Sequence, residues 1–328
     1  MLLISYGTRP EYIKIKPIIN AMLFAGLPFK TLFTGQHVDM VNVNSDFTIK
    51  IENGINRLDT IISSTMNSID YKKQGITAVM VQGDTTSALG IALSAFQNQI
   101  PVVHLEAGLR TYNLKQPFPE EANRQIISRI THLHLCPTEL SKLNLAKERV
   151  GGKIKVVGNT VLDNLENIKI NTQKKVLVTM HRRENFLNME RWFTEIDSLA
   201  AKMPDYEFLL PIHPNPEIKK HQNIFKFVKV TKHLDHDKLI NYLSSCSYVI
   251  TDSGGLQEES AFLKKPCLVC REETERKEGL GNFSLLCRDP NNLEERFLKL
   301  KDLKMQGDCP YGDGNAAKKI VKELELTI

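Results

Sequence analysis

The segment from His104 to Arg124, HLEAGLRTYNLKQPFPEEANR, crowds carboxylates and guanidinium groups into a stretch that fits no helix or strand period. Its acidic and guanidinium residues are Glu106, Arg110, Glu120, Glu121 and Arg124. The apolar run IPVVHL before Glu106 predicts a buried strand, and ligands of open α/β sheets bind at the carboxyl ends of such strands. Charged groups placed there lose hydration and need partners. The segment therefore predicts either a structural ion-pair network or an acid–base active site.

Two turns between a predicted strand and a predicted helix combine backbone amides with groups that bind anions. The first, SYGTRPEYIKIKP, has Arg9 and Lys14 in the first turns of its helix. The second, VITDSGGLQEES, opens a helix with a serine hydroxyl and two glycine amides, from Ser253, Gly254 and Gly255. Such a turn cradles phosphate, although an ordinary capped helix has the same residues. The first turn lacks the G-x-G-x-x-G and P-loop patterns, which disfavours ordinary dinucleotide or P-loop binding.

Polar groups also follow other predicted strands. Asp84 ends VQGD, while His181 and His213 follow the runs KVLVTM and LLPI. Two imidazoles at the same kind of edge favour acid–base chemistry about as much as a structural role. Glu259, one turn into the helix after the two glycines, suits a ribose diol. The chain has no His-Glu-x-x-His or comparable spacing, so no metal site is expected.

Strand-like apolar runs alternate with helical patterns along the chain, which predicts doubly wound parallel sheets in two Rossmann-like domains. The Asn- and Lys-rich stretch 162–175 has no core pattern and predicts the domain boundary. We expect an N-terminal domain over 1–163, a C-terminal domain over 164–313, and a helix over 314–328 that packs back on the N-terminal domain. The residues after PFKTLFTG are expected to form a short polar loop.

Composition narrows the class of protein. The 328 residues, 41% hydrophobic and 25% charged, suit a two-domain globular protein. The net charge of +5 comes without a basic block, so no nucleic-acid partner is expected, whereas an anionic small molecule fits. No apolar run reaches the ~18–20 residues of a membrane span, and Met1 leads directly into a predicted strand. We therefore expect a cytoplasmic protein without membrane contact, with its six scattered cysteines reduced.

Ordered motifs extend from Gly7 to Gly314 and include GTRPE, QGDTT, HLEAGLRT, PFPEEANR, GNTVLD, HRREN, PIHPNP, TDSGGLQEE, TERKEG and PYGDG. Together they resemble the non-hydrolysing UDP-N-acetylglucosamine 2-epimerases. The resemblance implies two Rossmann-like domains facing a cleft, as in GT-B glycosyltransferases, and a homodimer. It implies epimerisation at sugar carbon 2 of a UDP-sugar, without a cofactor.

The resemblance also assigns site residues by motif. The family's catalytic positions fall on Asp84, Glu106, Glu120 and His181. Its substrate-contacting or site-organising positions fall on Arg9, Lys14, Arg124, His213, Ser253, Gly254, Gly255, Glu259 and Arg276.

The family's mechanism agrees with these residue types. UDP is eliminated from carbon 1 to give a glycal, and it adds back after a proton arrives on the other face. Carboxylates would serve the acid and base steps, cations and amides would bind the diphosphate, and domain closure would exclude water. The chain departs from the family after GQHVDM, where a PDYDL segment and a Gly-Gln-Thr-like loop are missing, although Gln36 and His37 remain. Several bacterial members bind an activating second UDP-GlcNAc near this segment, so we predict that this chain needs none.

Three alternatives remain at this stage. A hydrolysing 2-epimerase would release N-acetylmannosamine and UDP, but those enzymes usually have GTRAD where this chain has Pro10 and Glu11. A GT-B glycosyltransferase would share the fold and the phosphate cradle without needing both carboxylate motifs. A non-catalytic nucleotide-sugar sensor would have lost the carboxylates, which this chain retains.

Overall fold

The computed structural model describes residues 1–36, 44–52 and 54–327. These residues form two compact units. The first unit is Met1–Asn164 together with Gly312–Ile328, and the second unit is Leu165–Tyr311.

The described strands of the first unit form one parallel sheet with β1 near its centre, in the order β3-β2-β1-β4-β5-β6-β7. The pairing places Leu2 of β1 opposite Phe29 of β2 and Ala78 of β4. The strands are β1 (Leu2–Tyr6), β2 (Phe29–Phe33), β3 (Phe47–Thr48), β4 (Ala78–Gln82), β5 (Val102–Leu105), β6 (Leu133–Cys136) and β7 (Lys153–Val156).

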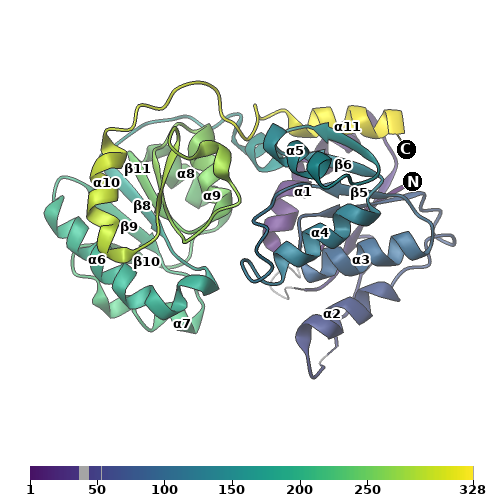
Figure 1. Ribbon diagram of the computed structural model, residues 1–328, viewed down its shortest axis with the longest axis horizontal. Helices are drawn as coiled ribbons and strands as arrows, with labels where there is room; N and C mark the ends of the chain where they lie inside the picture. The colour runs from purple at the N-terminus through teal and green to yellow at the C-terminus, as the bar shows by residue number, and fades with distance from the viewer. Residues whose placement is uncertain (37–43, 53, 328) are drawn as a thin grey trace. The chain divides into compact units, whose positions relative to one another are not determined.

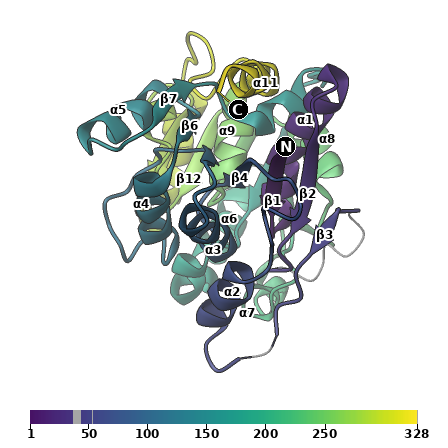
Figure 2. The same ribbon diagram turned by 90° about the vertical axis from the view of Figure 1, so that its right-hand side faces the viewer.

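Helices cover both faces of this sheet (Figures 1 and 2). The helices are α1 (Arg9–Ala25), α2 (Arg57–Met66), α3 (Thr86–Gln97), α4 (Glu120–Ile130), α5 (Glu139–Lys147) and α11 (Ala316–Thr327). Ile4 of β1 packs in a core with Ile15 of α1 and Ile320 of α11. Leu3 points to the opposite face, as strand alternation requires, and packs in a core with Ile91 of α3. The C-terminal helix α11 therefore completes one face of the first unit.

The expectation of a short polar loop after β2 is wrong, because this segment contains β3 and the helix α2. Asn56 caps α2 by accepting a hydrogen bond from the Leu58 amide. Ile61 and Thr65, four residues apart, form the buried face. Thr65 approaches α3 at Gly90, where a Cβ would lie 1.9 Å from Thr65 Oγ1. The mostly polar sequence of α2 concealed a helix whose packing depends on this glycine.

The second unit has its own parallel sheet, in the order β10-β9-β8-β11-β12-β13 among the residues described. Its strands are β8 (Lys175–Thr179), β9 (Glu207–Pro211), β10 (Lys229–Thr231), β11 (Tyr248–Thr251), β12 (Cys267–Cys270) and β13 (Ser284–Cys287). Its α-helices are α6 (Met189–Lys202), α7 (Pro216–Lys219), α8 (His236–Ser245), α9 (Gly254–Phe262) and α10 (Leu293–Lys301). Short 3-10 helices are η2 (Thr160–Leu165), at the boundary of the units, η3 (Arg183–Asn188), η4 (Gln222–Ile224), η5 (Lys277–Gly279) and η6 (Pro290–Asn292).

One large apolar core supports the second sheet. Trp192 and Phe193 of α6 and Phe297 of α10 pack in it with Val178 of β8 and Ile250 of β11. The helices α8 and α9 also contact the sheet, through β8, β11 and β12. Two doubly wound parallel sheets, each with its own core, confirm the predicted fold class.

Five of the cysteines are buried free thiols: Cys136, Cys246, Cys267, Cys270 and Cys287. Burial raises the pKa of the Cys267 thiol to about 12, so this group is protonated and unreactive at neutral pH. No cluster of metal-binding side chains occurs in the described part of the chain. Among the same residues, no helix is both long and apolar enough to span a membrane.

Candidate active site

The carboxylate of Glu106 lies at the carboxyl end of β5, the place that the sequence predicted for chemistry. Lys14 Nζ, from α1, donates to both of its oxygens at 2.7 and 2.6 Å. Gln82 Nε2, from the end of β4, donates to Oε2 as well. Glu106 is 9% exposed and has a φ of 65°, a backbone conformation that is uncommon outside glycine and clusters at functional sites. The cation and the amide both favour an ionised carboxylate.

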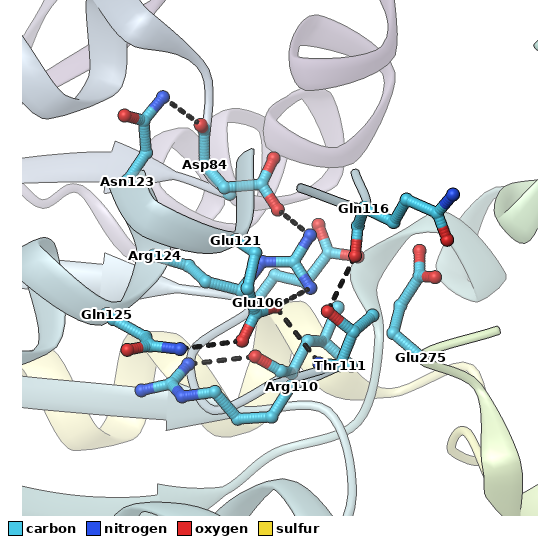
Figure 3. A network of polar contacts seen from close by, with 12 residues as sticks. Asp84, Glu106, Arg110, Thr111, Gln116, Glu121, Asn123, Arg124, Gln125 and Glu275 are labelled. Carbon is cyan, nitrogen blue, oxygen red and sulfur yellow. Dashed lines mark hydrogen bonds and ion pairs between the residues drawn. The ribbon is translucent and has the colours of Figure 1, made fainter. Parts of the chain in front are cut away.

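A second carboxylate, Asp84, follows the neighbouring strand β4. Arg124 of α4 pairs with Asp84 Oδ2 at 2.6 Å and with Glu121 Oε2 at 3.4 Å, so its guanidinium bridges the two acids (Figure 3). Asn123 donates to the Asp84 backbone carbonyl at 2.9 Å. A Cβ on the intervening Gly83 would lie 3.7 Å from Glu106 Oε2. The ends of β4 and β5 therefore bring Asp84 and Glu106 to one part of the first unit.

The first residues of α4 and α1 are two further predicted site residues, Glu120 and Arg9. Glu120 is the first residue of α4 and is half-buried. Its neighbour Glu121 is fully buried and accepts hydrogen bonds from the amides of Thr111 and Tyr112, each at 3.0 Å. Arg9 is the first residue of α1 and is exposed. Glu121 thus fixes the long segment between β5 and α4, while Arg9 is exposed at the start of α1.

Part of the charged segment is a structural network. Arg110 donates to Glu148 through Nε at 2.7 Å and Nη2 at 2.9 Å, and Nη2 also donates to Ser128 at 2.9 Å. These bonds join the segment to α4 and to the end of α5. The structural interpretation of the segment from His104 to Arg124 therefore holds for Arg110, whereas the acid–base interpretation stays a prediction for its other charged residues.

In the second unit, Asp252 organises the loop that carries His181. Asp252 is fully buried and accepts hydrogen bonds from the amides of His181 and Arg182 and from the side chain of Asn185. His181 Nδ1 lies 3.5 Å from Asp252 Oδ1. Burial lowers the pKa of His181, and the Asp252 carboxylate opposes that shift. The imidazole is thereby oriented by a fixed carboxylate at the carboxyl end of β11.

Two further imidazoles stand beside His181. The ring of His213 stacks on that of His181 with centroids 5.5 Å apart, and His233 meets His213 edge-on at 5.6 Å. Burial, followed by the two neighbouring imidazoles, lowers the pKa of His213 to about 4. His213 is therefore neutral at pH 7. Its Nδ1 accepts from the Asn215 amide at 3.2 Å, so Nε2 carries the ring proton and can donate a hydrogen bond.

The predicted phosphate cradle is the N-terminus of α9. Ser253 is the N-cap, and its hydroxyl accepts from the Leu256 amide at 3.5 Å. A Cβ on Gly254 would lie 2.9 Å from the guanidinium carbon of Arg276, whereas one on Gly255 would come no closer than 3.9 Å, to Ser253 Oγ. Gly254 thus serves the packing of Arg276, and Gly255 leaves space above the helix N-terminus.

Buried ion pairs hold two other predicted residues. Arg276 Nε donates to Glu258 at 2.9 Å, and Nη1 contacts Glu275. Glu259 pairs with His236 Nε2 at 2.7 Å. In this structure both residues contact protein groups, and their role in the site stays a prediction.

Comparisons with known proteins agree with this arrangement. A family model described as UDP-N-acetylglucosamine 2-epimerase matches residues 25–325. The chain belongs to this family. A UDP-N-acetylglucosamine 2-epimerase of Neisseria meningitidis serogroup A is 38% identical, over 98% of this chain and 98% of that protein.

Solved structures of the family have the same fold. The UDP-GlcNAc 2-epimerase from Neisseria meningitidis bound to UDP-GlcNAc has a TM-score of 0.91 and 34% identity, covering 99% of both chains. The Methanocaldococcus jannaschii UDP-GlcNAc 2-epimerase in complex with UDP-GlcNAc and UDP has a TM-score of 0.84 and 29% identity, covering 99% of both chains. This family member is accordingly an isomerase with two Rossmann-like units of the GT-B type.

Sequence reasoning missed several residues that hold the site of this family member together. They are Gln82, Asp252, His233 and His236. Gln82 lies in the QGDTT motif, two residues before Asp84, and Asp252 lies in the TDSGGLQEE motif, directly before Ser253. The position at the end of a strand was therefore the signal that the sequence offered. Gln82 is neutral, so the criterion of an acid or a cation at a strand end does not select it.

Proposed function

We propose that this chain epimerises carbon 2 of a UDP-2-acetamido sugar, interconverting UDP-GlcNAc and UDP-ManNAc or a related deoxy or uronic pair. A base removes the proton from carbon 2 while the bond from carbon 1 to the UDP oxygen breaks, which gives a glycal and free UDP. A proton then arrives at carbon 2 on the opposite face and UDP adds back to carbon 1. This reaction needs no cofactor. Carbon 2 has no neighbouring carbonyl that would make its hydrogen acidic, and the elimination of UDP takes the place of that activation.

The carrying observation is the pair of carboxylates, Asp84 and Glu106, at the ends of adjacent strands. Each forms an ion pair with a cation, Asp84 with Arg124 and Glu106 with Lys14. An elimination and its reversal require carboxyl groups that accept and return protons. We assign these steps to Asp84, Glu106 and Glu120, with His181 as a further acid–base group.

Diphosphate binding is assigned to groups that stabilise negative charge as UDP leaves. The N-terminus of α9, with Ser253 and the amides of Gly254 and Gly255, has the chemistry of a phosphate site. Arg9 adds an exposed cation. Glu259 is assigned to the ribose hydroxyls, held by His236. The relatives bound to UDP-GlcNAc and UDP support this choice of ligand.

Proton NMR of the purified chain with UDP-GlcNAc in deuterated water tests the reaction. Deuterium at carbon 2 of a sugar that remains attached to UDP, with UDP-ManNAc as a second species, is expected. Free N-acetylmannosamine and UDP would instead identify a hydrolysing 2-epimerase. An unchanged sugar that turns over only with an acceptor would identify a glycosyltransferase.

Isosteric substitutions test the carboxylates. Asp84→Asn, Glu106→Gln and Glu120→Gln keep size and remove acid–base function, so at least two should lower turnover by about a hundredfold with UDP binding little changed. Glu139→Gln, an exposed acid in the first turn of α5, is the matched control and should turn over normally. Near-normal turnover in all three test variants would refute the assignment.

Two properties of the assembly belong to the same proposal. We infer a homodimer that acts in the cytoplasm, where UDP-sugars are made. Light scattering coupled to size-exclusion chromatography tests the dimer: a monomer mass at assay concentration would contradict it.

A further inference from the structure

The side chain of Glu11 joins the caps of two helices that begin at different strands of the first unit. Glu11 is 3% exposed. Its Oε2 accepts from the amides of Gly7 at 2.8 Å and Thr8 at 2.6 Å, while its Oε1 accepts from Thr85 Oγ1 at 2.7 Å. Thr8 is the N-cap of α1, so the bond from the Thr8 amide is one half of a capping box, and the bond from Gly7 adds to it. The third bond leaves α1 altogether.

Thr85 performs the same capping function for α3. Its Oγ1 accepts from the Ala88 amide at 3.1 Å. The one hydroxyl hydrogen is donated to Glu11, and the oxygen lone pairs serve the helix cap. The two helix N-termini are therefore held in register by a single buried carboxylate, which both helix dipoles favour as an anion.

These two caps adjoin residues of the site. Arg9 follows Thr8 directly, and Asp84 precedes Thr85 directly. We propose that Glu11 is a positioning residue, which fixes the turn carrying Arg9 relative to the turn carrying Asp84. This inference rests on the proposed function, because it assigns Glu11 to the geometry of the same reaction.

Both the length and the charge of Glu11 matter to this role. Burial raises the pKa of Glu11, and the hydrogen bonds from Thr85, Gly7 and Thr8 oppose that shift. Aspartate keeps the charge but is one methylene shorter, so it cannot reach the two amides and Thr85 together. Glutamine keeps the length, yet its amide nitrogen would have to face either the amides or a hydroxyl whose oxygen already accepts from Ala88.

Thr85→Val is the sharpest test, because valine keeps the shape and removes only the hydroxyl. We expect kcat to fall by about tenfold or more, since misplacement of a reacting group by about 1 Å costs up to a hundredfold. KM should change by less than about threefold, because substrate contacts are left in place. Thr85→Ser restores the hydroxyl and should return kcat to within about twofold of the wild type.

Thr138→Val controls for the lost helix cap. Thr138 is the buried N-cap of α5 and accepts from the Ser141 amide at 3.1 Å, so this variant loses the same kind of cap outside the site. Its kcat should remain within about twofold of the wild type. A loss of turnover equal to that of Thr85→Val would mean that cap loss alone lowers activity, which overturns the inference.

Glu11→Asp provides an independent measurement that leaves the α3 cap hydroxyl in place. It should also lose turnover by about tenfold. Near wild-type kcat in either Glu11→Asp or Thr85→Val, with the wild type active on a UDP-sugar, overturns the role of Glu11. A wild type that does not epimerise any UDP-2-acetamido sugar refutes the proposed function instead.

Discussion

Substitution of Gly255 should weaken UDP binding without destabilising the fold. A Cβ at Gly255 would meet its nearest neighbour, Ser253 Oγ, at 3.9 Å, which is an ordinary van der Waals contact. Alanine or valine therefore fits the protein itself. The added carbons would lie in the first turn of α9, at the turn to which we assign the diphosphate.

The two effects have opposite signs, which makes the test specific. Glycine in a helix is less favourable than alanine by up to ~1 kcal/mol, so Gly255→Ala should leave the free energy of unfolding unchanged or raise it. Blocking the phosphate should weaken UDP by at least about tenfold for Gly255→Val, or ~1.4 kcal/mol of binding free energy. The alanine variant should show a smaller loss, because one methyl group excludes less volume than three carbons.

Calorimetric titration with UDP and urea denaturation measure the two quantities on the same samples. Gly151→Ala is the matched control, since a Cβ there has open space around it and no assigned ligand. Gly254→Ala, unlike Gly255→Ala, is expected to lower the free energy of unfolding, because its Cβ would meet the Arg276 guanidinium at 2.9 Å. A folded Gly255→Val variant with wild-type UDP affinity would refute the reasoning and move the phosphates elsewhere.

Three further predictions concern the first unit. Gln82→Leu removes a donor to Glu106 and should lower kcat by about tenfold. Gln82→Glu should lower kcat further, because it places a second negative charge beside Glu106. Equal kcat for the wild type and both variants in steady-state assays would contradict this. Burial lowers the pKa of His104 from 6.5 to about 3, so its contribution to stability is present above pH 6.5 and lost as the pH falls toward 3. Urea denaturation of His104→Gln should therefore show a shallower loss over that window than the wild type, and parallel curves would count against it. Residues 45–66 lack the family's activator elements, and Gln36 already accepts from the Ser87 amide. The rate of the reverse reaction should therefore depend hyperbolically on substrate concentration, without a lag. A lag abolished by trace UDP-GlcNAc would show that an activator site persists.

Strong periodicity and strand-end position carried the sequence predictions that the structure confirms. Apolar runs such as ITAVMV and KPCLVC became central parallel strands, because strands buried on both faces read as continuous hydrophobic segments. Residues chosen at the ends of those runs, such as Asp84, Glu106 and His181, lie at the carboxyl ends of strands. The topology of a doubly wound sheet fixes that edge once the strands are known.

The features that could not be predicted from the sequence depend on contacts between segments that are distant along the chain. The helix α2 has a weak apolar signal, and its position depends on a close approach to Gly90 of α3. Glu11 reads as an ordinary capping-box residue from its local sequence, and only the tertiary structure reveals its bond to Thr85. Likewise, the pairing of Glu259 with His236 joins the middle of α9 to the first residue of α8. A single sequence carries no local pattern for such pairs.

Burial and ion pairing alone do not separate the acids that we propose as catalytic from the structural acids of this protein. The Lys14–Glu106 and Arg110–Glu148 pairs are both short and both mostly buried, with side-chain exposures of 13% and 7% against 0% and 15%. The backbone distinguishes them. Glu148 continues a helical backbone at the end of α5, whereas Glu106 leaves β5 in the left-handed region at φ 65°. A residue that the fold holds in an unfavourable conformation, with a cation and an amide on its oxygens, has been oriented at the expense of stability. Orientation of that kind is what acid–base chemistry requires and what a structural ion pair can do without.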